Sequence, residues 1–338
     1  MSALALASCE KKNLPVNEDT GYMEVLLDGA ELISKASSTT SQTYESQVNT
    51  VQILAFNSNG LLSAYLNNGT SLKGSLELIT GTHTVWAVVN GPSFAGIAKQ
   101  SDLESYSIDL SSSSKTASLG FIMGGSASVT ISSGKTTSTT IAVNRYTSRV
   151  HLASIENSLP SALGSITING VFLCNVLGNQ NIACDAAAKT WYNKDGRKDE
   201  TTRNKTHIID GSTYLASCPS LTYMTLSENT IACGATKTYP TGLLYCFPNT
   251  STVTPTGFQS SYSPAKTVLC IAATICGVKQ YYPVVLSEVM ERNKSYSVNV
   301  VICGLGSDDP VKPVEKGTLC ATVTVSGWSA GKEYNDDI

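Results

Sequence analysis

The sequence predicts an all-β protein built from two β-sandwich domains in tandem. Only 14% of its 338 residues are charged, whereas surface helices usually carry many Lys and Glu residues. Polar and apolar residues alternate in many short stretches separated by turn residues, a pattern typical of sandwich strands. A chain of this length has room for about two domains. We place them at residues 13–144 and 145–338, after a leading segment at residues 1–12.

The first predicted domain opens with a strand at residues 22–28, in which Met23, Val25 and Leu27 face one side. A stretch rich in Ser, Thr and Gln follows at residues 35–47, and we expect it to form an exposed loop. One helix is expected at residues 91–107. Further strands are expected at residues 48–57, 61–66, 74–79, 82–90, 117–123, 126–131 and 136–143.

The second predicted domain repeats the same alternation after the junction. A polar, irregular region is expected at residues 176–240. Strands are expected on both sides of it, at residues 148–155, 166–175, 243–248, 267–275, 280–286, 295–304 and 318–325.

The N-terminus carries a candidate lipid-attachment signal. Leu6-Ala7-Ser8-Cys9 resembles a bacterial lipobox, in which the cysteine becomes the first mature residue and carries lipid. The apolar stretch before it is too short for a complete signal peptide, so we interpret Met1 as a late or truncated start. Lipid on Cys9 would then anchor the exported protein to the outer membrane. The alternative is an Ala-rich start with a buried cysteine.

The remaining nine cysteines all lie in the second half of the chain. There is no Cys-x-x-Cys pair and there are only three histidines, which argues against a zinc site. We interpret most of the cysteines as small buried hydrophobic side chains. One or two disulfides are an open alternative in an exported protein, and the sequence does not define their pairing.

Composition and motifs indicate no catalytic site, no cofactor and no metal. A net charge of −3 predicts no nucleic-acid partner, since phosphate binding needs a concentrated basic surface. Neither a nucleophile elbow nor a phosphate-binding loop occurs. Asp308-Asp309 before Pro310 is expected to form a turn rather than a calcium site. The pairs Trp191-Tyr192 and Tyr281-Tyr282 are candidates for a sugar-stacking surface.

Several stretches resemble the fimbrillins, the major-fimbrial-subunit proteins of the type V pili of Bacteroidales. Their order and spacing, together with the lipobox, carry the resemblance over most of the chain. These stretches are 81–90 (GTHTVWAVVN), 121–125 (FIMGG), 143–150 (VNRYTSRV), 244–249 (LYCFPN) and 281–328, the last of which contains 291–298 (ERNKSYSV) and 304–310 (GLGSDDP).

The resemblance implies a specific architecture and mode of assembly. Fimbrillins are exported lipoproteins with two transthyretin-like β-sandwich domains. Shaft subunits lose an N-terminal strand by proteolysis, and a strand from a neighbouring subunit fills the groove, a form of β-augmentation. The implied partners are other copies of the chain or related fimbrial subunits, and the surface receptor is unknown. The implied role is adhesion or biofilm formation.

The residues that match these parts can be named. The removable strand would carry Met23, Val25 and Leu27, with cleavage between Lys35 and Ala36 in the following loop. The donor strand would be the C-terminal segment with Leu319, Ala321, Val323 and Val325 on one face. The alternative is that this segment is simply the last strand of its own domain.

One departure from the family keeps other functions open. Shaft subunits that mature by Arg-specific cleavage are cut after an Arg in this loop, whereas the first Arg here is Arg145. An anchor or tip subunit that keeps its N-terminal strand is therefore the second hypothesis. A monomeric, glycan-binding surface lipoprotein is the third.

Overall fold

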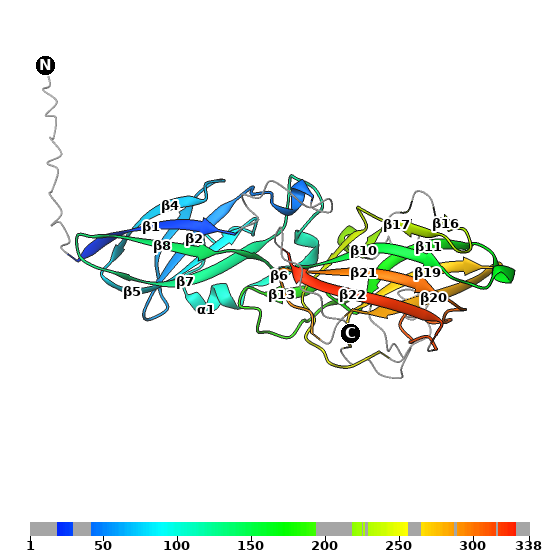
Figure 1. The fold of residues 1–338 in the computed structure, drawn as a ribbon. Coiled ribbons are helices and arrows are strands. Elements are labelled where there is room, and N and C mark those ends of the chain that lie inside the picture. The colour runs from blue at the N-terminus through cyan, green and yellow to red at the C-terminus, as the bar shows by residue number, and fades with distance from the viewer. Residues whose placement is uncertain are drawn as a thin grey trace, which may run out of the picture.

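The computed structural model describes residues 19–29, 42–193, 218–224, 226, 229–255, 265–286, 289–315 and 317–328. These residues form two groups of β-sheets that lie end to end along the long axis of the molecule (Figure 1). Helices are confined to single short turns among the described residues. The all-β prediction is confirmed.

Two sheets face each other in the N-terminal half. One sheet has the strand order β4-β1-β8 and the other has the order β3-β2-β5-β7-β9. The strands are β1 (Thr20–Asp28), β2 (Val51–Asn57), β3 (Leu62–Asn67), β4 (Lys73–Ile79), β5 (Gly81–Val89), β7 (Met123–Ile131), β8 (Thr136–Ala142) and β9 (Asn144–Arg145). Alternate apolar side chains of both sheets fill the space between them, among them Met23, Val25, Leu27, Ile53, Ala55, Leu76, Val85 and Ala87.

Two further sheets form the C-terminal half. One has the order β17-β10-β21-β22, with β18 also pairing with β10, and the other has the order β15-β11-β19-β20, with β16 also pairing with β11. The strands are β10 (Ser148–Asn157), β11 (Ile166–Cys174), β15 (Tyr223–Met224), β16 (Thr230–Ile231), β17 (Thr236–Thr238), β18 (Leu243–Cys246), β19 (Val268–Ile275), β20 (Val278–Val285), β21 (Lys294–Ile302) and β22 (Leu319–Gly327).

Short elements complete the described fold. They are η1 (Thr43–Glu45), α1 (Gln100–Glu104), β6 (Ser107–Asp109), η2 (Leu110–Ser112), β12 (Val176–Leu177), β13 (Asn179–Asn181), β14 (Trp191–Tyr192), η3 (Ser161–Leu163) and η4 (Ser220–Thr222). Strand β6 pairs with β13, so a two-stranded sheet bridges the two halves of the chain.

The two halves also share a continuous apolar core. Leu54 and Phe56 of β2 belong to the same buried cluster as Tyr245 and Val298 from the second half. Both faces of β2 are therefore buried, which explains its unbroken apolar sequence. The chain passes from the first group of sheets to the second between Arg145, which pairs with Met123, and Ser148, which pairs with Cys246. The division at residues 144–145 into two domains stays a prediction.

Three local expectations were wrong. The helix expected at residues 91–107 is only the single turn α1, because Gly91, Pro92 and Gly96 disfavour a longer helix and residues 107–109 form a strand instead. The strand expected at 117–123 is absent, because residues 117–122 form a turn and an irregular segment, whereas the strand expected at 126–131 is present as part of β7. The turn at Asn67–Gly69 joins strands of two different sheets rather than closing a hairpin.

Candidate assembly elements

Strand β1 lies in the middle of the three-stranded sheet. It pairs antiparallel with β4 and parallel with β8, so its backbone groups are bonded on both sides. The side chains of Met23, Val25 and Leu27 are at most 2% exposed. Tyr22 and Leu26, on the opposite face, are exposed. Removal of β1 would leave two unpaired strand edges and an open apolar slot in the core.

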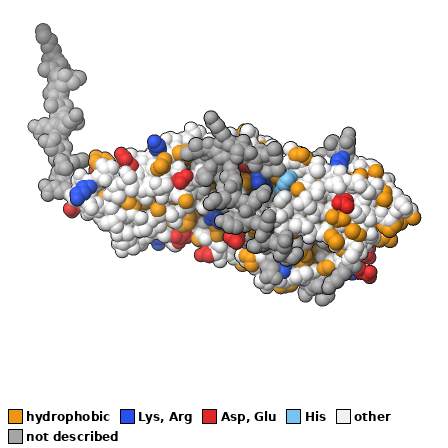
Figure 2. All heavy atoms as spheres, viewed as in Figure 1, with side chains coloured by type: hydrophobic (Ala, Val, Ile, Leu, Met, Phe, Trp, Pro, Cys, Tyr) orange, Lys and Arg blue, Asp and Glu red, His pale blue; other side chains and the backbone are white. Residues whose placement is uncertain are grey.

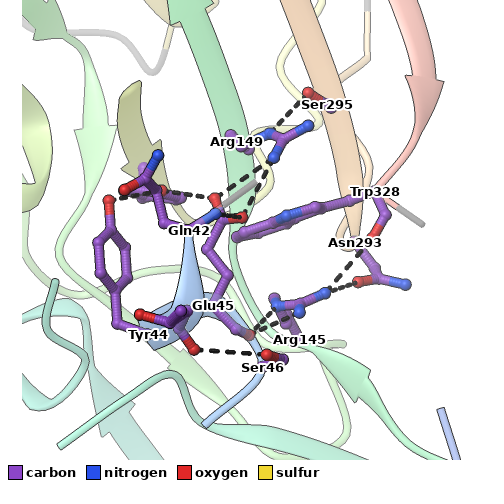
Figure 3. Close-up of polar contacts among 11 residues, drawn as sticks. Gln42, Tyr44, Glu45, Ser46, Arg145, Arg149, Asn293, Ser295 and Trp328 are labelled. Atoms are coloured by element: carbon purple, nitrogen blue, oxygen red, sulfur yellow. Dashed lines mark hydrogen bonds and ion pairs between the residues drawn. The ribbon is translucent and has the colours of Figure 1, made fainter. Parts of the chain in front are cut away.

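The segment that follows β1 is tied to the junction of the two halves by Glu45 at the end of η1. The Glu45 side chain is 1% exposed. Its carboxylate accepts hydrogen bonds from Arg149 Nη1 at 3.2 Å and from the Tyr245 hydroxyl at 2.6 Å (Figure 3). Its other partner is the backbone N–H of Gln42, at 3.1 Å. Element η1, the next described element after β1, is thereby held by two strands of the C-terminal half, β10 and β18.

Arg145 and Trp328 form the opposite side of this buried network. The Arg145 side chain donates hydrogen bonds to the backbone carbonyl of Glu45. Its guanidinium lies 4.4 Å from the centre of the Trp328 ring, which stacks on Tyr245 at a centroid distance of 5.4 Å. Figure 3 shows Trp328 between Arg149 and Arg145. Trp328, which follows β22, is thus anchored beside Glu45 of η1.

Burial sets the ionisation of this network. Desolvation, followed by the repulsion of Arg149, lowers the pKa of Arg145 to about 9. Burial and the neighbouring Glu45 carboxylate raise the pKa of the Tyr245 hydroxyl well above its usual value. Tyr245 therefore stays protonated at neutral pH and can donate its hydrogen bond to Glu45.

A second cationic group, Lys115, also joins the two halves. Its ammonium donates a hydrogen bond to the backbone carbonyl of Leu243 at 2.8 Å and a longer one to that of Tyr223. Burial lowers the pKa of Lys115 to about 8. This contact ties the N-terminal half to β18 and β15.

Strand β22 is the outer strand of its sheet. It pairs antiparallel with β21 over its full length, from Leu319 opposite Ile302 to Gly327 opposite Lys294. Val323 is buried, and Leu319 and Val325 pack partly onto the core, whereas Ala321 is exposed. This position agrees with the alternative that the segment is the last strand of its own domain. Because only one neighbour holds it in the sheet, it could also leave by breaking one row of hydrogen bonds.

The remaining predictions from the sequence concern the lipidation and cleavage residues, a sugar-stacking pair and an acidic turn. Cys9, Lys35 and Ala36 lie outside the described residues. The proposed sugar-stacking pair Tyr281-Tyr282 is wrong, because these side chains are 7% and 0% exposed. Asp309 accepts hydrogen bonds from the backbone N–H groups of Val311 and Lys312, as expected for a turn.

The described residues offer neither a metal site nor a membrane-spanning helix. They contain no cluster of three or more His, Cys, Asp or Glu side chains that could hold a metal ion. No helix in the described part of the chain is long and apolar enough to cross a membrane. On the face shown in Figure 2, Lys and Arg side chains are scattered among uncharged ones and form no continuous patch.

Sequence reasoning missed Glu45. It lies in the stretch at 35–47 that we expected to be an exposed loop, yet its side chain is buried. The signal that could have found it is the pair Tyr44-Glu45, a large aromatic beside a carboxylate in an otherwise small, polar stretch. Its partners Arg149 and Tyr245 do lie in stretches that carry the fimbrillin resemblance.

Comparison with known proteins gives a consistent picture. Residues 22–171 match the model of a family described as "Fimbrillin-A associated anchor proteins Mfa1 and Mfa2". A search of curated proteins gave no match. The matched residues include β1, η1 and Arg145, but they cover less than half of the chain.

Solved structures match over nearly the whole chain. A fimbrilin from Porphyromonas gingivalis W83 is 12% identical, with 91% of this chain and 98% of that chain covered and a TM-score of 0.63. The tip fimbrial protein Mfa3 from Porphyromonas gingivalis is 13% identical, with coverages of 91% and 100% and a TM-score of 0.54. A structure described as a cell adhesion protein, from Bacteroides eggerthii, is 17% identical, with coverages of 92% and 96% and a TM-score of 0.63. The resemblance to the fimbrillins is confirmed, and this chain has the same fold as these three structures.

Proposed function

We propose that this chain, which has the fold of the fimbrillins, is a non-catalytic subunit of a cell-surface fimbria that polymerises by donor-strand exchange. In this proposal it is exported as a lipoprotein through Cys9 and reaches the outer membrane. Its partners are other copies of itself or related fimbrial subunits, and the fibre supports adhesion or biofilm formation.

The placement of β1 carries this proposal. Three fully buried side chains, Met23, Val25 and Leu27, each contribute about 1.5–3 kcal/mol when buried. Without these side chains, the space left by β1 exposes apolar surface to water. It should therefore bind another strand that alternates apolar and polar residues. The C-terminal strand β22 offers that alternation through Leu319, Ala321, Val323 and Val325, and it has nine residues, as β1 has.

The bond between Glu45 and Arg149 supports the cleavage site at Lys35–Ala36. Cleavage there would separate β1 from the rest of the chain, while η1 would remain fixed at the junction by Glu45. The body of the subunit could then keep its structure when β1 leaves. The sheets also support two sandwich domains at residues 13–144 and 145–338 as the units of this architecture.

An anchor subunit is the second candidate function. The family matched by residues 22–171 is described by its anchor proteins, and the segment between β1 and η1 holds no Arg. An anchor would keep β1 and remain attached through the lipid on Cys9, so it would accept no donor strand in this slot.

One experiment separates these functions. The full chain is expressed on the surface of a Bacteroidales host, and fibres and cell envelope are isolated separately. Electron microscopy and mass spectrometry of the mature N-terminus are then applied to both. A shaft subunit begins at Ala36 and fills the fibre, whereas an anchor begins at lipidated Cys9 and stays in the envelope. A soluble, monomeric product without fibres would contradict both.

A further inference from the structure

Two cysteines lie side by side where the last two strands of the C-terminal sheet meet. Cys320 is the second residue of β22 and is opposite Val301 of β21. Cys303 follows the last residue of β21. The backbone N–H groups of Cys303 and Gly304 both donate to the carbonyl of Thr318, at 2.8 and 3.2 Å. Two residues thus oppose one, as in a β-bulge, directly beside Cys320.

This register places the two side chains on the same face of β21 and β22, because Cys303 lies two residues after Val301, the partner of Cys320. Burial raises the pKa of the Cys303 thiol, and the neighbouring Cys320 raises it further. Cys320 is exposed and Cys303 is half-buried, so both can be reached from solvent. A disulfide needs its two cysteines on adjacent backbones with side chains on the same side, and the register of β21 and β22 supplies this arrangement.

The surroundings distinguish this pair from other thiols of the chain. Cys246 and Cys270 are buried, and burial raises the pKa of Cys246 to about 12. The exposed thiols of Cys233 and Cys276 instead contact the backbone carbonyls of Leu159 and Leu163. Reactivity requires thiolate and access: Cys246 lacks both, and Cys270 lacks access.

We propose that Cys303 and Cys320 form an intramolecular disulfide that fastens the start of β22 to the end of β21. The oxidant is the disulfide of a thiol oxidoreductase, or of oxidised glutathione in vitro. The thiolate of exposed Cys320 attacks that disulfide and forms a mixed disulfide, releasing one thiolate. The thiolate of Cys303 then attacks Cys320 and displaces the second. Two thiols lose two protons and two electrons, and one disulfide of the oxidant becomes two thiols.

The bond would change the behaviour of an edge strand. Strand β22 is held in its sheet by β21 alone, so it opens more easily than a central strand. A covalent link at Cys320 closes the loop of residues 304–319 and keeps the two strands in register when the hydrogen bonds open. The proposal does not depend on the fimbrial function, since it requires only access to an oxidant.

Peptide mapping tests the bond directly. The full chain is purified under reducing conditions, oxidised with oxidised glutathione, treated with N-ethylmaleimide and digested with trypsin without reductant. Cleavage after Lys294, Lys316 and Lys332 gives one peptide with Cys303 alone, 295–316, and one with Cys320 alone, 317–332. We expect these two peptides to be linked by a disulfide, with no maleimide on Cys303 or Cys320.

Three single-cysteine variants test the pairing. Cys320→Ser should abolish the linked peptide, whereas Cys276→Ser, at another exposed thiol, should leave it unchanged. Amide hydrogen exchange of residues 319–327 should slow on oxidation in the wild type and in Cys276→Ser, but not in Cys303→Ser. Maleimide on both Cys303 and Cys320 after oxidation would overturn the proposal. So would linkage of Cys320 to another cysteine or to a second chain.

Discussion

The Glu45 carboxylate and the Arg149 guanidinium lie 3.2 Å apart in the buried junction between the two halves of the molecule. Glu45 comes from the turn after β1, and Arg149 comes from β10. The pair therefore connects the segment that follows the first strand to the central part of the C-terminal sheets. Element η1 is therefore held in place by the C-terminal half and does not depend on β1 for its position.

Replacing Glu45 with Ala should destabilise the protein strongly. The change leaves Arg149 without its carboxylate and Tyr245 without its acceptor in a buried site. Breaking a buried ion pair costs about 3–5 kcal/mol. Urea unfolding at pH 7 measures the free energy of unfolding. The control is Glu77→Gln, an exposed carboxylate bonded to Thr20, which should change that free energy by less than about 0.5 kcal/mol. Equal effects of the two variants would contradict the role of Glu45.

Substitutions at two adjacent residues of β1 should affect the free energy of unfolding very differently. Val25→Asp places a charge among fully buried side chains, and we expect it to lower the free energy of unfolding by about 3 kcal/mol or more. Leu26→Asp, on the exposed face of the same strand, should be nearly neutral. Urea unfolding of both variants makes the comparison. A large effect of Leu26→Asp would mean that its face of β1 is covered by another part of the chain.

Most strands could be predicted because alternation is a local property of the sequence. Residues 22–28, 136–143 and 318–325 were each assigned to a strand, and the structure has β1, β8 and β22 there. The burial of Glu45 could not be predicted in this way, because its partners Arg149 and Tyr245 are about 100 and 200 residues away in sequence. The placement of Cys303 and Cys320 on one face of adjacent strands likewise depends on the register of β21 and β22.

The buried cation Lys115 predicts a specific dependence of stability on pH. Its pKa is about 8 in the folded protein, below the unfolded value of 10.5. Between these values the unfolded state binds more protons, so the contribution of Lys115 to stability rises with pH from about 8 to 10.5. The full change is on the order of 3 kcal/mol.

The measurement compares Lys115→Met with the wild type. Unfolding free energies are determined at several pH values from 7 to 10, and the difference between the two proteins is plotted. The stability of the wild type relative to Lys115→Met should rise over this range, because only the wild type carries the titrating group. Lys135→Met, at an exposed position, should show a constant difference from the wild type. A constant difference for Lys115→Met would contradict the depressed pKa.

The final prediction tests whether the alternation of β22 is what a vacated slot recognises. A synthetic peptide of residues 318–328, with Cys320→Ser to exclude disulfides, is labelled with a fluorophore. It is offered to the intact chain and to the chain cut after Lys35. The peptide should bind only the cut protein, from which β1 can dissociate, because its apolar face can replace Met23, Val25 and Leu27.

Matched peptides identify the face that enters the slot. A peptide with Val323→Asp should bind about tenfold more weakly or worse, since a charge in an apolar groove costs more than about 1.4 kcal/mol. A peptide with Thr322→Asp places the same charge on the opposite face and should bind nearly as well as the parent. These changes are in the peptide, so the fold of the receiving protein is unaffected. If both peptides bound equally, β22 would not be the donor, and its role would be that of the last strand of its own sheet.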